Sequence, residues 1–158
     1  MKTIVVGYDG SEASQLALDR VAELAPLLQA KVIVTSVEMP IVADGGLMPA
    51  PAVNVDLDLH EREHRERERL LREAQSYLDE RGIAAEVAAA VGPPVDEIIE
   101  VAEQRDADLI VVGTHEPGFL ERLLRGSVSQ GVARRAHCDV LIVHPRGKER
   151  SDGRNSHA

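Results

Sequence analysis

The strongest fold signal in this sequence is DLIVVGTHEPGFLERLLRGSVS, at residues 108–129. It begins with a continuous aliphatic run, residues 109–112, that ends at Gly113 and is typical of a parallel strand covered on both faces. A loop follows, and a helical pattern opens after Gly126 and Ser127. Unpaired backbone N–H groups and the positive end of the helix dipole would then point into one cleft, which indicates an anion site. The alternative is that both glycines only form tight turns and that Ser127 is an ordinary N-cap.

Aliphatic runs and helical patterns alternate along the rest of the chain. Four more runs predict strands, at residues 2–8, 31–37, 83–91 and 139–143. Helical spacing between the first two predicts one buried stripe, formed by Ala13, Ala17, Val21, Leu24 and Leu28. Similar patterns precede the last two strands, at Val95, Ile98, Ile99 and Ala102 and at Val128, Val132, Ala133 and Ala136. Buried strands joined by helices predict a single-domain, doubly wound (Rossmann-like) α/β sandwich with a five-stranded parallel sheet.

A densely charged segment, residues 60–81, predicts a long helix that docks by its C-terminal half. Its apolar stripe is confined to Leu70, Ala74, Tyr77 and Leu78. The preceding residues, 38–59, are rich in proline and glycine and predict a loop long enough to act as a lid. We expect one domain over residues 1–145 and a polar, disordered tail over residues 146–158.

Composition restricts the class of protein. The chain has 158 residues, 44% of them hydrophobic, and a formal net charge of −9. This charge argues against a general nucleic-acid binder, which would need a basic face. The single cysteine, Cys138, excludes an internal disulfide and suits a reducing compartment, where we expect it to be a small core residue. No apolar run approaches the length of a membrane span and no signal peptide is evident, so we expect a cytoplasmic protein with no membrane partner.

The expected ligand position follows from the fold class. Doubly wound sheets bind ligands beyond the carboxyl ends of their strands, where the strand order reverses. Asp9 follows the first strand and Gly113 ends the fourth. If these two strands are neighbours, the two residues face each other across a crevice, although the sequence pattern does not require that adjacency. Asp9 could instead be a turn residue before a helix capped by Ser11.

Four short motifs resemble the universal stress protein family: DGSE at 9–12, GPP at 92–94, VVGTH at 111–115 and HCDVLIV at 137–143. The resemblance covers residues 2–145. It implies an adenine nucleotide alpha hydrolase-like fold with sheet order 3-2-1-4-5. It also implies a stress-response module that forms a homodimer through the edges of its last strands.

The ATP-binding branch of that family carries glycine, two residues, glycine, nine residues, and then glycine followed by serine or threonine. Gly113 fits the first position, and Gly126 with Ser127 fits the last, but Glu116 occupies the middle one. A non-glycine residue at positive φ costs about 1–2 kcal/mol. A carboxylate near a phosphate adds repulsion of about 1–4 kcal/mol. Against this, Gly118 could supply the flexibility, or Glu116 could help to hold Mg²⁺.

The resemblance implies that ATP or another adenine nucleotide, with Mg²⁺, is the ligand. The nucleotide-binding residues it implies are Asp9, Val37, Gly113, Thr114, Gly126, Ser127, Val128 and Ser129. The sequence has no Walker-type P-loop and no positioned catalytic base, so we expect no catalytic residues and a switch or sensor with at most slow hydrolysis. The alternative, favoured by Glu116, is a dimeric partner-binding protein that has lost the nucleotide.

A competing motif is His60-Glu61-Arg62-Glu63-His64, which satisfies H-E-x-x-H on a predicted helix. Such a motif can bind zinc through both histidines, with Glu61 as the general base of a hydrolase. The flanking residues are charged, whereas a catalytic zinc site needs a face that excludes water. We therefore expect no metal site here and keep the zinc hydrolase as a remote alternative.

Overall fold

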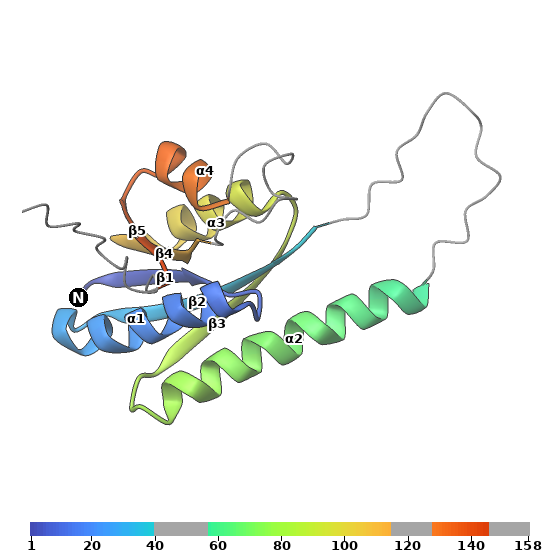
Figure 1. Cartoon of the computed structure of the whole chain (residues 1–158), viewed down its shortest axis with the longest axis horizontal. Coiled ribbons are helices and arrows are strands. Elements are labelled where there is room, and N and C mark those ends of the chain that lie inside the picture. Colours follow the sequence, from blue (N-terminus) through green and yellow to red (C-terminus); the bar gives the residue numbers. More distant parts are fainter. Residues whose placement is uncertain (40–56, 115–127, 146–158) are drawn as a thin grey trace, which may run out of the picture.

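The computed structural model describes residues 1–39, 57–114 and 128–145. Strands and helices alternate along this part of the chain (Figure 1). The elements are β1 (Thr3–Gly7), α1 (Glu12–Leu28), β2 (Lys31–Glu38), α2 (Leu57–Asp79), β3 (Ala85–Val91), α3 (Pro94–Gln104), β4 (Leu109–Gly113), α4 (Val128–Arg135) and β5 (Asp139–Val143). The predicted lid and the predicted tail fall largely or wholly on residues 40–56 and 146–158, which lie outside the described residues.

The five strands form one parallel sheet in the order β3-β2-β1-β4-β5, which confirms the predicted fold class and topology. β1 is central, and its Ile4 pairs with Val32 of β2 and Leu109 of β4. Figure 1 shows α1 and α2 on one face of the sheet and α3 and α4 on the other. The adjacency of β1 and β4, which the sequence left open, is therefore present.

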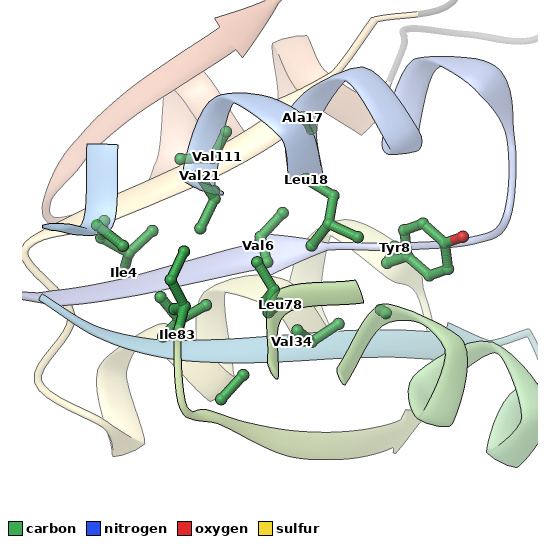
Figure 2. Packing of buried hydrophobic residues seen from close by; sticks show 14 of the residues in the cluster. Ile4, Val6, Tyr8, Ala17, Leu18, Val21, Val34, Leu78, Ile83 and Val111 are labelled. Atoms are coloured by element: carbon green, nitrogen blue, oxygen red, sulfur yellow. The ribbon is translucent and has the colours of Figure 1, made fainter. Parts of the chain in front are cut away.

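The core has two layers because both faces of the sheet are covered. Ile4, Val5 and Val6 of β1 are all fully buried. Ile4 and Val6 belong to the cluster between the sheet and helices α1 and α2 (Figure 2), whereas Val5 belongs to the cluster that contains Ile98 of α3. Alternate residues of one strand thus enter opposite clusters, which explains why the strands are continuously aliphatic.

The buried stripe of α1 differs from the predicted one at its C-terminal end. Ala13, Ala17 and Val21 are buried, but Leu28 is 42% exposed, so its assignment to the core was wrong. Ala25 takes the last buried position. The reason is the reversal of the chain into β2: Gln29 adopts the left-handed conformation and the Ala30 N–H donates to the Ala25 carbonyl at 2.9 Å, so residues 26–28 at the end of α1 lie outside the packed layer.

Helix α2 starts three residues earlier than predicted, at Leu57. It docks by its C-terminal half, as predicted, through Leu71, Ala74 and Leu78, while its first turns extend beyond the carboxyl end of the sheet (Figure 1). Arg67 of the same helix is only 8% exposed. This burial of a charged side chain was not predicted. No helix among the described residues is long and apolar enough to span a membrane.

Candidate functional site

The carboxyl ends of β1 and β4 lie side by side and meet the start of α1. A Cβ atom at Gly113 would lie 2.1 Å from the carbonyl oxygen of Ala13 and 2.4 Å from its carbonyl carbon. Ala13 is in the first turn of α1, shortly after Asp9. The end of β4 therefore touches the backbone that follows Asp9, and only glycine allows this approach.

Asp9 shapes the turn between β1 and α1. Its Oδ1 accepts from the Ser11 N–H at 2.9 Å, and its own N–H donates to Ser14 Oγ at 3.3 Å. Ser11 is the N-cap of α1, as predicted, since its Oγ accepts from the Ser14 N–H at 3.1 Å. Gly10 adopts a φ of 79°, a conformation that favours glycine. The turn role that was the alternative for Asp9 is thus present, and Asp9 is exposed just beyond the carboxyl end of β1.

The other predicted ligand residues that the structure describes lie at the end of β4 and at the start of α4. The Thr114 N–H donates to the Val143 carbonyl at 3.0 Å, which continues the pairing of β4 with β5. Ser129, in the first turn of α4, is only 3% exposed, whereas Val128 beside it is exposed. Gly126 and Ser127, the other residues predicted to contact the phosphates, lie outside the described residues. So does Glu116, which replaces the middle glycine of the ATP-binding pattern.

Val37 lies at the carboxyl end of β2, where it pairs with Ala90 of β3. Its side chain packs against the second core cluster. The side chain therefore has a structural role, and only the backbone of Val37 is placed at the edge of the sheet where a ligand would bind.

An ion pair beside Val37 was missed by the sequence analysis. Arg67 Nη1 lies 2.5 Å from Glu38 Oε2 and 3.4 Å from the Ala90 carbonyl oxygen. The pair joins α2 to the ends of β2 and β3. One signal was available: Arg67 precedes Leu71, Ala74 and Leu78 at helical spacing and so occupies the buried face of α2.

The second histidine of the H-E-x-x-H motif, His64, has partners on its own helix. His64 Nδ1 lies 2.9 Å from Arg67 Nη2, and its Nε2 lies 3.2 Å from Glu68 Oε1. Both ring nitrogens of His64 are therefore engaged by neighbours on the same helix. A hydrolase site that uses His60 and His64 as its ligand pair gains no support from this arrangement.

Cys138 is partly buried and packs against the second core cluster. Burial raises the pKa of its thiol, and the nearby carboxylates of Asp139 and Asp108 raise it further. A raised pKa disfavours the reactive thiolate, which agrees with the predicted role as a small core residue.

The fold and the site together define a class of protein. It is a doubly wound α/β domain in which β1 and β4 are neighbours, and sheets of this type bind ligands beyond the carboxyl ends of their strands.

The family follows from comparison with known proteins. The model of the universal stress protein family matches residues 1–144, and the chain belongs to that family. A universal stress protein of Mycobacterium tuberculosis is 36% identical over 144 residues, which cover 90% of this chain and 96% of the relative. Another, from Methanocaldococcus jannaschii, is 34% identical over 148 residues, covering 94% of this chain and 85% of the relative.

Solved structures show the same architecture. A universal stress protein in complex with cAMP is 35% identical, with a TM-score of 0.66 and coverage of 90% of this chain and 96% of that one. The universal stress protein of Archaeoglobus fulgidus in complex with dAMP is 25% identical, with a TM-score of 0.63 and coverage of 90% and 97%. The sheet order and the adenine nucleotide alpha hydrolase-like fold are those of this family.

Proposed function

We propose that the chain binds an adenine nucleotide in the crevice between the ends of β1 and β4. The observation that carries the proposal is the contact of Gly113 with Ala13, because it brings the end of β4 against the turn that presents Asp9. The complexes of two relatives with cAMP and dAMP support the choice of an adenine nucleotide.

The proposed roles follow the chemistry of each group. The Asp9 carboxylate would accept hydrogen bonds from ribose hydroxyls, and the Val37 backbone would face the adenine. The phosphates would lie at the start of α4, where backbone N–H groups and the helix dipole favour an anion. The residues proposed to line them are Gly113, Thr114, Gly126, Ser127, Val128 and Ser129. Mg²⁺ would enter with the phosphates of ATP, and the protein would act as a switch or sensor with at most slow hydrolysis.

Calorimetry on the full chain tests the proposal with ATP·Mg²⁺, AMP and cAMP as separate ligands. We expect one nucleotide per chain. Asp9→Ala should weaken binding by about tenfold, the value of one lost charge-assisted hydrogen bond. Ser11→Ala is the matched control, because it removes the cap of α1 but keeps the carboxylate. Absence of both heat and thermal shift with all three ligands at millimolar concentration would contradict the proposal.

A second candidate function rests on Glu116, which stands where the ATP-binding branch has glycine. In that case the chain is a dimeric partner-binding protein that has lost the nucleotide. Glu116→Gly would remove the φ penalty and the charge repulsion that the family resemblance implies, so in this case we expect it to tighten ATP binding by at least about tenfold. Glu116→Gln removes the charge alone and separates the two effects. If the Glu116→Gly variant binds ATP no better than the natural chain, Glu116 is not what limits the site.

A further inference from the structure

Three potential metal ligands converge at the carboxyl end of β2. They are Glu38, the last residue of β2, with His60 and Glu63 from the first turns of α2. One ligand atom from each of the three lies within 4.8 Å of the other two. His60 and Glu63 are three residues apart on one helix and so share a face.

This cluster has an unsatisfied group. Glu63 Oε2 is buried and has no hydrogen-bond partner among the described residues. Leaving a buried acceptor unpaired is unfavourable, and more so for a charged one. Glu38 is different, because its Oε2 is already paired with Arg67. The cluster thus holds two carboxylates, of which only that of Glu38 is paired with a guanidinium, and a cation would neutralise the remaining negative charge.

We propose that Glu38, His60 and Glu63 form a binding site for a divalent transition metal of the zinc class. One imidazole with two carboxylates is a donor set suited to Zn²⁺, whereas Mg²⁺ and Ca²⁺ prefer oxygen ligands alone. Arg67 holds one oxygen of Glu38 and leaves the other to face the ion. His60 is exposed while both glutamates are partly buried, which provides an entry path for the ion from solvent.

The proposed site uses the HEREH segment in a different way from a zinc hydrolase. His64 is directed to Arg67 and Glu68 instead of to the cluster. The third ligand, Glu38, comes from the sheet, so the ion would link the start of α2 to the end of β2. This link lies one residue from Val37, whose backbone is at the proposed adenine edge.

The test is to remove metals from the full chain with a chelator and then to titrate it with Zn²⁺. The absorption spectrum of bound Co²⁺ is a second readout, which reports the ligand geometry. We expect one ion per chain, little competition from Mg²⁺ or Ca²⁺, and a loss of affinity of at least about tenfold in each of His60→Gln and Glu63→Gln. Two matched controls from the same helix, Glu61→Gln and His64→Gln, should retain the affinity.

Other outcomes would overturn the proposal. Binding that is lost in His64→Gln but kept in Glu63→Gln would assign the metal to the histidine pair of the H-E-x-x-H motif. Binding that His60→Gln does not weaken would place the ion elsewhere in the chain. Absence of Zn²⁺ binding to the natural chain would remove the site altogether, and circular dichroism of every variant separates ligand loss from misfolding.

Discussion

At the scale of single residues, the glycines that end β1 and β4 have different environments. A Cβ atom at Gly7 would lie 3.5 Å from the side chains of Ile98 and Val112, an ordinary contact distance. At Gly113 it would overlap the Ala13 backbone. We expect Gly113→Ala to lower the free energy of unfolding by about 1–3 kcal/mol through overpacking, and to weaken nucleotide binding because α1 must move.

Gly7→Ala is the matched control for this prediction. It adds the same methyl group at the end of the neighbouring strand. We expect the free energy of unfolding to change by no more than about 1 kcal/mol, because alanine lowers the entropy of the unfolded chain and this offsets slight crowding in the folded state. Urea unfolding of both variants gives the comparison. Equal stabilities of the two variants would show that the contact between β4 and α1 does not constrain the site.

A second residue-scale prediction concerns Asp108, which directly precedes β4. Its Oδ1 accepts from Lys2 Nζ and its Oδ2 from the Thr3 N–H, both at 2.9 Å. The hydrogen bond from Lys2 and then that from Thr3 hold the pKa of the Asp108 carboxyl below its ordinary value. Because the folded pKa is below the unfolded pKa of about 3.9, the stabilisation is complete well above pH 4. It is lost as the pH falls through the folded pKa.

Asp108→Asn should therefore lower stability at pH 7 and reduce the loss of stability on acidification below about pH 4. Lys2→Met should change both quantities in the same direction but by less, because the hydrogen bond from the Thr3 N–H to Asp108 remains. Thermal unfolding of the three proteins between neutral and acidic pH provides the measurement. If Asp108→Asn loses as much stability on acidification as the natural chain, other carboxyl groups control the pH dependence.

At the scale of elements, α2 is attached to the sheet by a buried charge as well as by apolar contacts. The Arg67 side chain is 9% exposed and that of Glu38 is 16% exposed. Arg67→Leu leaves the Glu38 carboxylate without its partner, and we expect a loss of about 2–4 kcal/mol in the free energy of unfolding. The double variant Arg67→Leu with Glu38→Leu should recover much of this loss, because a well-packed apolar pair can replace a buried ion pair.

Arg69 provides the control for this cycle. It pairs with Glu66 and Glu73 on the same helix, but its side chain is 50% exposed. Arg69→Leu should change stability by no more than about 1 kcal/mol, the range of exposed ion pairs. Urea unfolding of the three variants and the natural chain in metal-free buffer completes the test. A double variant as unstable as Arg67→Leu alone would show that the ion pair itself is needed.

The elements also show what the sequence could and could not predict. The strands were predictable because a strand covered on both faces needs aliphatic residues at every position, as at Ile4, Val5 and Val6. Leu28 was placed in the core wrongly because spacing does not reveal where a helix leaves the packed layer. The burial of Arg67 was not predicted because its partner, Glu38, is 29 residues away and only the tertiary fold brings the two together.

At the scale of the whole molecule, the strand order decides which residues can form a site. Local patterns predicted the ends of β1 and β4, but pairing of strands distant in sequence is set by the tertiary fold. The family resemblance supplied that order, and the structure confirms it. The contact of Gly113 with Ala13 and the cluster of Glu38, His60 and Glu63 were beyond prediction, since each joins segments that have no common periodicity.

The same strand order leaves β5 at one edge of the sheet and β3 at the other. We propose, as the family resemblance implies, a homodimer formed through the β5 edge. Val140, Leu141 and Ile142 are only partly buried in the single chain, and an unpaired edge strand is a template for pairing with a second chain. Light scattering should then give twice the chain mass of 17.2 kDa.

Lysine substitution on the two edges tests which one pairs. Leu141→Lys would place like charges close together across a symmetric β5–β5 contact, where charged edge residues oppose pairing, so we expect a monomer. Val87→Lys makes a similar change on β3, where Val87 is 40% exposed, and should leave the dimer intact. Each variant must first show a native circular dichroism spectrum, since Leu141 also packs against the first core cluster. Either of two results would exclude β5 as the interface: a Leu141→Lys variant that folds and remains a dimer, or a monomer produced by Val87→Lys alone. The reason is that the added lysines come close together only on the strand that pairs with its own copy.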